Sequence, residues 1–479
     1  MDFPVFHLDF MGNRMLIAVI AIVHVIINHA MAVGLMPLVT ILEYRGFRLS
    51  MINRDEAEKW DNLAYKILFV AFVVTTSFGA LTGVGIWFSV SLVNPASIGS
   101  LIRVFYGAWF TEWIVFVLEV GAIMVYFLTW KNSGRSEKAK RNHVMTGAFL
   151  SIFSWLTMAI IVAILGFMMD PGNWLNKQNL ITGFANPIYL PQLLFRTPVA
   201  MIMAGTFALF LSYFFLRKDN VIYKKAIRMI SFWVLFWTPY TMLGAYLYYY
   251  EIPNLMFGNL PVAIGTQQFI HWYRALSRLI IFSGLVAIVV SLTGLIWPKR
   301  VPRLLIIFPV IFIFFFMGYF ERIREFIRKP YVIGNYMYAN AILENELELY
   351  HREGILKHAT YVSTSEITEE NKLEAGQEVF LLSCTRCHTT QGINSVVKNF
   401  EKMYGKGTSF NVEAMKVYIA GMHNVKLFMP PFPGNSKELD ALAHYIKSLQ
   451  EYPKRLEGAQ TEGVAIQPRK ININPDQTD

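Results

Sequence analysis

Eight long apolar runs occupy the first two thirds of the sequence, and they constrain its fold more than any other feature. Each is long enough to cross the hydrocarbon core of a membrane, which takes about 20 mostly apolar residues. Charged residues make up only 16% of the chain, whereas they make up about 25% of typical soluble domains. The sequence therefore predicts an all-α bundle of eight membrane spans, over residues 14–42, 64–92, 104–130, 143–168, 191–216, 226–250, 271–297 and 304–324.

The basic residues of the connecting loops predict how the bundle is oriented. The loops after the first, third, fifth and seventh runs carry 16 Lys and Arg residues, whereas the opposite loops carry 2, Arg103 and Lys177. Cytoplasmic loops hold the excess of positive charge in membrane proteins. We therefore expect both termini, and everything after the eighth run, on the outer side of a bacterial inner membrane, which is the periplasmic side. This distribution also argues against nucleic acid as a partner, despite a net charge of +10.

Composition divides the chain into four predicted parts. Residues 1–330 form the membrane bundle, with its N-terminus outside. Residues 331–370 are polar and amphipathic, and we expect a helical linker on the outer membrane surface. Residues 371–452 have the character of a small, compact all-α domain, and residues 453–479 form a polar tail without periodicity.

Both cysteines of the chain lie in one short motif, Cys384-Thr385-Arg386-Cys387-His388. This spacing is typical of covalent heme attachment, because two thiols must reach the two vinyl groups of one heme while the next residue brings an imidazole under the iron. A zinc site or a redox pair is the alternative, but a zinc site requires two further ligands at regular spacing, and the sequence offers none. The motif therefore predicts one covalent heme c, with His388 as an axial ligand.

A second axial ligand is expected about 40 residues further along the chain. Met429 lies in the proline-framed sequence MPPFPG, and a thioether opposite a histidine is a known ligand pair of c-type hemes. His423 is the alternative ligand, although no comparable loop frames it. We expect Met429 to complete the coordination of the heme iron.

Two glutamates, Glu112 and Glu119, lie seven residues apart in the third run and therefore share one helix face. Charged side chains within a span are costly, and they are functional candidates by default. One interpretation is a relay that carries protons inward from the outer side. The other is a pair of structural carboxylates that bind neighbouring helices through hydrogen bonds.

Several histidines of the bundle are candidate heme ligands. His24 lies in the first run, roughly 15 Å below the predicted outer surface by helical rise, and His29 follows on another face. A lone histidine in a bundle is usually a hydrogen-bonded polar residue, but two beside acidic residues favour ligation. His271 opens the seventh run on the outer side and is a further candidate. His143 begins the fourth run on the cytoplasmic side, where we expect it to be interfacial.

Arginines gather in the outer halves of the later runs. They could neutralise heme propionates by bidentate pairing, or they could form a salt-bridge network or extend toward the membrane surface. The residues concerned are Arg196, Arg274 and Arg278, together with Arg322, Arg324 and Arg328, which lie beside Glu321 and Glu325 at the end of the eighth run.

The membrane part resembles subunit I of cytochrome bd-type oxidases. Arg14 followed by His24 is similar to the family's first span, whose histidine ligates a heme of the oxygen-reducing pair. The stretch FVLEV, with Glu119, resembles the family's third span, where this glutamate belongs to the active site and proton path. Glu112 lies one residue out of register with the family's other glutamate, and Glu43 lies near the acidic residue at the inner end of the family's first span.

The most specific resemblance is at the end of the eighth run. GYF at 318–320 and REFIRKPY at 324–331 resemble the family's GWxxxExGRQPW, with Tyr319 in place of a tryptophan and two extra residues between the halves. The resemblance implies a heme-ligand role for Glu325 and a propionate-binding role for Arg328.

The chain also departs from the family. The fifth-span histidine that ligates the low-spin heme b falls on Arg196, and its methionine partner falls on Ile280, beside a matching arginine at Arg278. The long quinol-binding loop and the ninth span are missing. These losses suggest that an external heme c replaces the family's quinol-oxidising part.

The leading hypothesis is a bd-like terminal oxidase subunit that takes electrons from a periplasmic cytochrome c or another redox protein and reduces oxygen. Its cofactors would be one heme c and two or more non-covalent hemes of b or d type, and the resemblance implies a second membrane subunit as partner. The alternative is a non-catalytic electron-transfer subunit of a larger respiratory complex. A degenerate membrane anchor is a third possibility, but such an anchor has no need of the buried charges.

Overall fold

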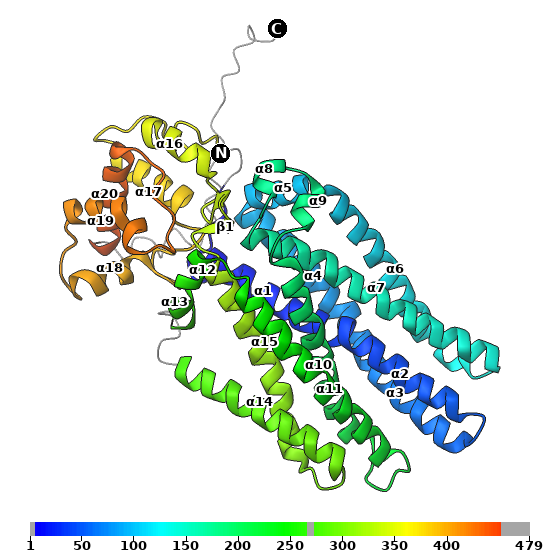
Figure 1. Cartoon of the computed structure of the whole chain (residues 1–479). Coiled ribbons are helices and arrows are strands. Elements are labelled where there is room, and N and C mark those ends of the chain that lie inside the picture. The colour runs from blue at the N-terminus through cyan, green and yellow to red at the C-terminus, as the bar shows by residue number, and fades with distance from the viewer. Residues whose placement is uncertain (1–4, 266–272, 452–479) are drawn as a thin grey trace, which may run out of the picture. The chain divides into compact units, whose positions relative to one another are not determined.

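The computed structural model describes residues 5–265 and 273–451 (Figure 1). In these residues the chain is predominantly helical, and the only strands are β1 (Tyr331–Ile333) and β2 (Met337–Tyr338), which pair antiparallel. The predicted all-α fold class is therefore confirmed.

Two predicted features lie outside the described residues. They are the candidate ligand His271 and the polar tail 453–479.

The chain forms two compact units. The larger comprises Val19–Ile86 and Ser100–Ile327, and the smaller comprises Met1–Ala18, Trp87–Gly99 and Arg328–Asp479. The smaller unit therefore joins the beginning of the chain to its C-terminal part.

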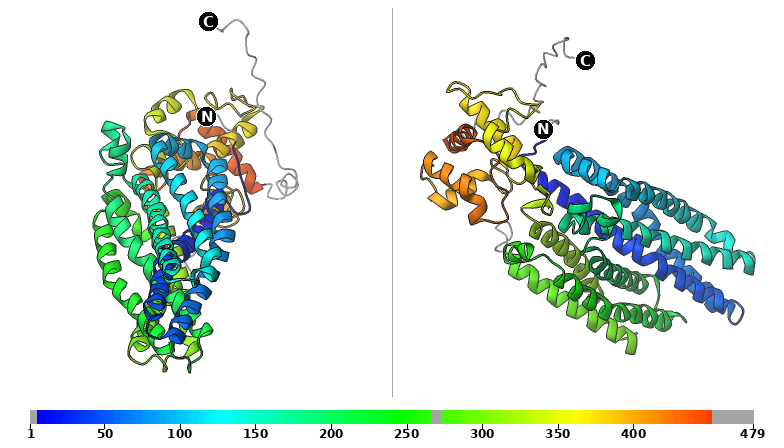
Figure 2. Two further views of the ribbon diagram at one scale, coloured as in Figure 1. Left: turned by 90° about the vertical axis from the view of Figure 1, so that its right-hand side faces the viewer. Right: turned by 45° about the horizontal axis from the view of Figure 1, so that its top comes forward.

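Long helices run side by side through the larger unit (Figures 1 and 2). Short helices and turns connect them. The helical segments up to residue 327 are α1 (Asn13–Ile27), η1 (Asn28–Gly34), α2 (Leu35–Leu49), α3 (Arg54–Val74), η2 (Thr75–Gly79), α4 (Ala80–Val93), α5 (Pro95–Val104), α6 (Tyr106–Ser133), α7 (Glu137–Met169), α8 (Trp174–Lys177), α9 (Leu180–Phe184), α10 (Tyr189–Phe215), α11 (Tyr223–Tyr250), α12 (Asn254–Gly258), α13 (Leu260–Ile264), α14 (Tyr273–Ile296), η3 (Arg303–Ile306) and α15 (Ile307–Ile327).

Among the described residues, seven helical stretches are long and apolar enough to cross a membrane, so the chain is a multi-pass membrane protein. They correspond to seven of the eight predicted spans. The remaining run, 226–250, lies in α11, a continuous helix that packs against α10 and α14. Its many tyrosines and tryptophans lower the mean hydropathy of this helix, which is not among the seven stretches. The sixth predicted span, over residues 226–250, therefore stays a prediction.

Polar caps begin the helices that follow two of the basic loops. The Asn53 side chain accepts a hydrogen bond from the backbone N–H of Glu56 at the start of α3, and Ser136 accepts one from Ala139 at the start of α7. These caps satisfy backbone donors that have no partner inside the helix. They fix where the second and fourth spans begin.

Two π-helical segments, η1 and η2, interrupt the first two spans and pack against each other. At the end of η1, a Cβ on Gly34 would lie 2.2 Å from the carbonyl oxygen of Ala200 in α10. No side chain fits such a backbone contact, so Gly34 permits the close packing of the first span against α10. Segments of this kind are frequent at functional sites, and His29 lies within η1.

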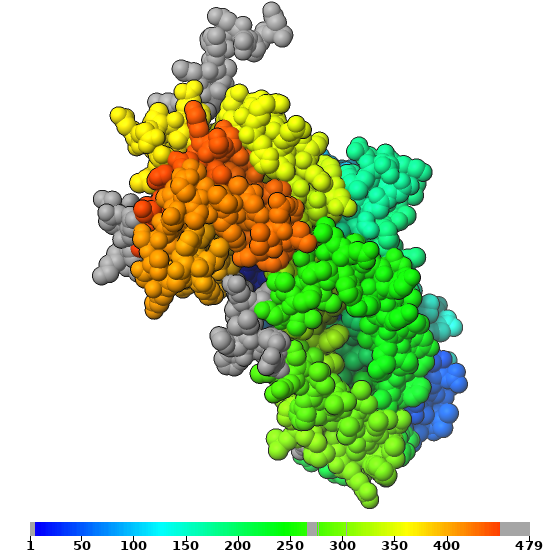
Figure 3. Space-filling model, turned by 60° about the vertical axis from the view of Figure 1, so that its left-hand side comes forward, coloured from blue at the N-terminus to red at the C-terminus, as the bar shows by residue number. Residues whose placement is uncertain are grey.

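The smaller unit has a helical core of its own, and α18 to α20 form much of the orange surface in Figure 3. Its apolar side chains include Val379, Phe380, Met415 and Ile446. The helical segments are η4 (Glu344–Glu346), α16 (Leu347–Glu353), α17 (Lys372–Ser383), α18 (Val396–Tyr404), α19 (Val412–Val425) and α20 (Ser436–Glu451).

The expected helical linker differs from the structure. Residues 331–370 contain the β1–β2 hairpin, η4 and only one short helix, α16. Ile342, Ile355 and Leu356 are almost completely buried in the same core as α17 and α20. The segment therefore belongs to the C-terminal domain rather than forming a spacer, because its apolar side chains complete that core.

We predict that Gly376→Ala destabilises the C-terminal domain. Gly376 lies where α17 meets α20, and a Cβ there would lie 2.1 Å from the carbonyl oxygen of Ala441. Overpacking a helix contact of this kind typically costs about 1–3 kcal/mol. Thermal unfolding of the solubilised full-length protein, followed by far-UV circular dichroism, should show an earlier transition for this domain.

The matched control is Gly421→Ala in α19, where a Cβ would meet nothing within 4 Å. Alanine is favoured over glycine inside a helix by roughly 1 kcal/mol, so this variant should unfold slightly later than the wild type. Equal behaviour of the two variants would contradict the packing argument.

Candidate functional site

The Cys-x-x-Cys-His motif folds as a tight turn at the end of α17. The backbone N–H groups of Cys387 and His388 both donate to the carbonyl oxygen of Cys384, at 3.0 and 2.8 Å. Asn394 closes the loop that follows, because its side-chain amide donates to the carbonyl oxygen of Cys387 at 2.7 Å. The turn therefore gathers the two thiols and the imidazole on one short piece of chain.

The orientation of His388 suits an iron ligand. Its Nδ1 lies 3.2 Å from the carbonyl oxygen of Asn394. A carbonyl oxygen can only accept, so Nδ1 carries the proton and Nε2 keeps its lone pair. Burial lowers the pKa of His388 to about 4, so the ring is neutral at physiological pH. Ligating histidines commonly donate their other ring N–H to such a backbone carbonyl.

The loop that bears Met429 is fixed by hydrogen bonds from two histidines. His423 donates through Nδ1 to the carbonyl oxygen of Met429 at 2.6 Å, and His351 donates through Nε2 to that of Phe432 at 2.6 Å. His423, the alternative ligand, thus contacts the backbone of the residue with which it was predicted to compete.

One cationic side chain lies within the motif and another lies beside it. Lys329 is buried, and its Nζ lies 3.0 Å from Sγ of Cys387. Nε of Arg386 is buried without a hydrogen-bond partner among the described residues. Its Nη1 donates to the carbonyl oxygen of Leu382 at 2.8 Å, so Nε is left to pair with an anionic group such as a heme propionate. Across the described parts of the chain, no group of three or more His, Cys, Asp and Glu residues could hold a metal ion, so the zinc alternative gains no support.

In the larger unit, His24 has a geometry comparable to that of His388. Its Nδ1 lies 3.2 Å from the carbonyl oxygen of Gly79 in η2 and 3.2 Å from Oγ1 of Thr82. Donation to the carbonyl leaves the Nε2 lone pair available to a metal. Gly83 gives the ring room, because a Cβ there would lie 3.1 Å from Cε1 of His24.

A buried cluster of charges surrounds Arg196. This arginine has no exposed surface, and its Nη2 lies 2.5 Å from Oε1 of Glu321. Arg324 donates through Nε to Oε2 of the same carboxylate at 2.9 Å. Nη1 of Arg324 and Nε of Arg196 have no hydrogen-bond partner among the described residues. Two guanidinium groups thus share one carboxylate, so these three residues carry a net positive charge.

His29 belongs to the same cluster. Nη1 of Arg196 lies 3.3 Å from Nε2 of His29. Because a guanidinium can only donate, Nε2 of His29 accepts this hydrogen bond. The geometry therefore favours a hydrogen-bonding role for His29 over the predicted role as a ligand.

Three other predicted cofactor-binding residues lie at separate positions. Glu325 is half-buried near the end of α15, Arg328 is buried just after it, and Arg278 is exposed on α14. The buried carboxylate at the end of the eighth span is Glu321, which no heme role had been predicted for. Its partner Arg196 lies in another helix far along the chain, so sequence spacing alone gave no sign of the pair.

The two predicted proton carriers differ in their surroundings. Glu119 is buried and accepts hydrogen bonds from Ser154 at 2.7 Å and Thr157 at 3.0 Å, both on α7. Glu112 is half-buried and has no hydrogen-bond partner among the described residues. Tyr126 continues the seven-residue spacing on α6.

Tyr126 leads to a second buried polar cluster, centred on Glu43. This carboxylate is completely buried and accepts from the Tyr126 hydroxyl at 2.6 Å. Nδ1 of His143 also lies 2.6 Å from it, and Nζ of Lys140 lies 2.7 Å from it. Lys140 pairs further with Asp61. His143 was expected at the interface, but it is buried, because it is hydrogen-bonded to the buried Glu43 carboxylate.

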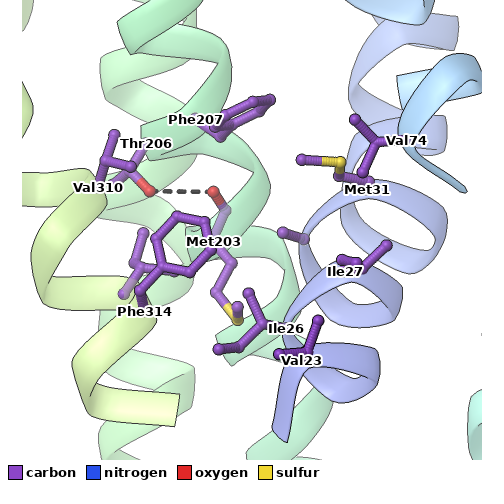
Figure 4. Close-up of a pocket in the computed structure, with 12 residues that line it drawn as sticks. Val23, Ile26, Ile27, Met31, Val74, Met203, Thr206, Phe207, Val310 and Phe314 are labelled. Atoms are coloured by element: carbon purple, nitrogen blue, oxygen red, sulfur yellow. Dashed lines mark hydrogen bonds between the residues drawn. The ribbon is translucent and has the colours of Figure 1, made fainter. Parts of the chain in front are cut away.

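An apolar cavity of about 230 Å³ lies among η1, α1, α10 and α15 (Figure 4). Met31, Met203 and Phe314 are among its lining residues. Thr206 is the polar residue of the lining, and its hydroxyl already donates to the carbonyl oxygens of Ile202 and Met203. The cavity therefore suits an apolar group.

Both parts of the chain are similar to known proteins. Residues 373–450 match the family model for cytochrome c. A chain of the bd oxidase from Geobacillus thermodenitrificans has a similar structure, with a TM-score of 0.52 and 15% sequence identity, over 68% of this chain and 89% of that chain. No curated protein sequence matches significantly.

These findings define the class of the protein. At this identity the structural likeness shows the fold alone, so the membrane part has the fold of a bd oxidase chain. The C-terminal part is a cytochrome c domain, which supports one heme c. The chain is thus a multi-pass membrane protein in which a bd oxidase-like bundle is fused to a cytochrome c domain.

We predict that Glu43→Gln strongly destabilises the bundle. The substitution would leave Lys140 and His143 without their shared anion in a buried site. Removing one partner from a buried ion pair typically costs roughly 3–5 kcal/mol. The measurement is the midpoint of thermal unfolding of the solubilised protein.

Glu56→Gln is the control, because Glu56 pairs with the half-exposed Lys225 at 2.7 Å. Loss of an ion pair near the surface should cost less than about 1 kcal/mol. If both variants lower the midpoint equally, the Glu43 cluster is not a special support of the fold.

Proposed function

We propose that this chain is a bd-like terminal oxidase subunit that receives electrons through its own heme c and reduces oxygen inside the bundle. The observation that carries the proposal is the geometry of His24, which lies in a bundle of bd oxidase fold and has its Nε2 available to a metal. The fused cytochrome c domain supplies a route for electrons.

In the cytochrome c domain, Cys384 and Cys387 would attach the heme through thioether bonds, and His388 and Met429 would ligate its iron. The heme supplies one-electron redox chemistry when bound. The hydrogen bond from His388 to Asn394 orients the imidazole, and the one from His423 supports the Met429 loop. Arg386 would neutralise a propionate.

In the bundle, His24 and Glu325 would ligate a pair of non-covalent hemes, with Arg328 at a propionate. Val23, the residue before His24, lines the cavity of Figure 4. The apolar walls of this cavity suit a heme macrocycle or a small apolar gas. Arg278 and His271 are further candidates for this cofactor-binding role.

Glu119 would pass protons to the site of oxygen reduction, with Glu112 as a second carrier. Ser154 and Thr157 would hold the Glu119 carboxyl group in place. The Tyr126–Glu43–His143 cluster, which joins α6, α2 and α7, supports an extension of this relay along the bundle.

The arrangement at Arg196 supports entry of electrons by way of heme c. Arg196 stands where the family has a low-spin heme ligand, and it is held by Glu321 and His29. A guanidinium in this ion pair does not ligate iron. In the family, electrons from quinol enter at the low-spin heme. In this chain, electrons would instead arrive from an external redox protein through heme c.

The proposal includes a location and a partner. The basic loops favour the periplasmic side of a bacterial inner membrane for the cytochrome c domain. A second bd-like membrane subunit would cover α6, where Phe110, Trp113 and Val117 are exposed and the carboxyl group of Glu112 would otherwise face lipid.

One observation favours the alternative of a non-catalytic electron-transfer subunit. Arg196 stands in place of the family's low-spin heme ligand, and its guanidinium is held in an ion pair with Glu321. The chain would then link membrane hemes or quinone to external cytochromes, and a partner would perform the catalysis.

Spectroscopy of the purified protein tests the two functions. Pyridine hemochrome spectra count the covalent and non-covalent hemes, and spectra of the reduced protein under carbon monoxide and oxygen detect a high-spin heme. A heme c together with a gas-reactive heme supports the oxidase. A heme c with no gas-reactive heme overturns the oxidase and supports the electron-transfer subunit.

We predict that His24→Ala removes a non-covalent heme and that His29→Ala does not. His24 has its Nε2 free for iron, whereas the same atom of His29 accepts from Arg196. The hemochrome spectrum of each variant should retain the full content of heme c. If His29→Ala loses the heme and His24→Ala keeps it, the assignment of the ligand is wrong.

A further inference from the structure

We propose that the segment before the first membrane helix, residues 5–12, is a strap that holds the heme c loop, and that Asp9 is a positioning residue for His388. The inference rests on the heme c site proposed above. The strap and the C-terminal domain belong to the same compact unit of the chain.

Asp9 binds the residues that directly follow the heme ligand. Its Oδ1 accepts from the backbone N–H of Thr390 at 2.5 Å, and its Oδ2 accepts from the Thr390 hydroxyl at 2.8 Å and from the backbone N–H of Gln391 at 3.2 Å. His7 contributes a further contact to Oδ1 at 2.9 Å. One carboxylate thus has four partners, three of them in the loop after His388.

That loop in turn holds the imidazole. Its two ends are joined, because the N–H of Val396 donates to the carbonyl oxygen of Thr389 at 2.8 Å and the Ser395 hydroxyl donates to that of Thr390 at 2.5 Å. Within the loop, the carbonyl oxygen of Asn394 accepts from Nδ1 of His388. Asp9 therefore acts on the ligand through the loop that orients it.

The fit of the strap is close along its length. A Cβ on Gly392 would lie 2.0 Å from the carbonyl oxygen of Asp9, and a Cβ on Gly12 would lie 3.2 Å from Cγ2 of Thr389. Val5 packs against the apolar core of the domain. Asn13 folds the strap back, since its side chain donates to the carbonyl oxygen of Phe6 and accepts from the N–H of Leu8.

The charge of Asp9 is constant under physiological conditions. Burial raises the pKa of this carboxyl, but hydrogen bonds from His7, Thr390 and Gln391 outweigh burial and lower the pKa to about 2. The ordinary pKa of this group is 3.8. The ionised carboxylate therefore stabilises the folded domain fully above pH 3.8, and this contribution is lost only as the pH falls toward 2. At physiological pH Asp9 therefore keeps a fixed negative charge.

Two consequences for the heme follow. A hydrogen-bond partner that fixes the outer side of a ligating histidine tunes the metal it binds. A negative charge near the iron favours the ferric form, which carries one more positive charge, and so lowers the reduction potential. Asp9 would act in both ways.

The test is Asp9→Asn in the full-length protein. We expect a higher midpoint potential of heme c in a redox titration followed at its α-band, with the same shift at pH 6 and pH 8. Glu413→Gln is the matched control, because this carboxylate is exposed on α19 and pairs only with Lys416 among the described residues. The control should leave the midpoint unchanged.

A second pair of variants tests the hydrogen bond without changing the charge. Thr390→Val removes the hydroxyl that donates to Asp9, and Thr390→Ser keeps it. We expect Thr390→Val to alter the low-spin ferric electron paramagnetic resonance spectrum, which reports ligand orientation, and Thr390→Ser to retain the wild-type spectrum.

The outcomes separate this inference from the proposed function. If the wild type carries no heme c in its hemochrome spectrum, the heme site itself is wrong. If heme c is present and Asp9→Asn leaves its midpoint unchanged, the role of Asp9 is wrong. If Asp9→Asn fails to retain heme, the two Thr390 variants decide. Identical spectra for Thr390→Val and Thr390→Ser would then show that the strap does not position His388.

Discussion

A charge inside a membrane is costly unless an opposite charge lies beside it, and two buried ion-pair clusters organise the larger unit. Arg196 with Glu321 and Arg324, and Glu43 with Lys140 and His143, are buried ion-pair clusters that each join different helices. Lipid offers no water to solvate an unpaired charge. Each cluster therefore fixes which helices are neighbours, and backbone contacts between helices, such as that of Gly34 with Ala200, can be close.

The parts of the fold that depend on local pattern could be predicted from the sequence. Apolar length identified the membrane helices, and the Cys384–His388 motif identified the cytochrome c domain, because spacing within a few residues determines both. Pairings between distant residues could not be predicted. His143 is 100 residues from Glu43, and Arg196 is in a different helix from Glu321. The sequence shows that such residues are costly to bury, but it does not show which partner each finds.

The segment after the eighth span shows the same limit for apolar residues. Its polar composition suggested a linker, yet Ile342, Ile355 and Leu356 are buried with α17 and α20. Few apolar side chains suffice when each one fills a position in an existing core. Composition averages over the segment and so misses these positions. The heme loop, too, takes support from a distant part of the chain, because Asp9 accepts hydrogen bonds from it.

The contact of Asp9 with Thr390 spans 381 residues. During synthesis, the segment that carries Asp9 leaves the ribosome first, and the loop that it holds is made only after every membrane helix. Contacts of such high sequence separation form late, because the intervening chain must first be ordered. The cytochrome c domain therefore cannot reach its final form until both ends of the chain lie on the same side of the membrane. Completion of this domain would thus report that the bundle has been inserted with the right topology.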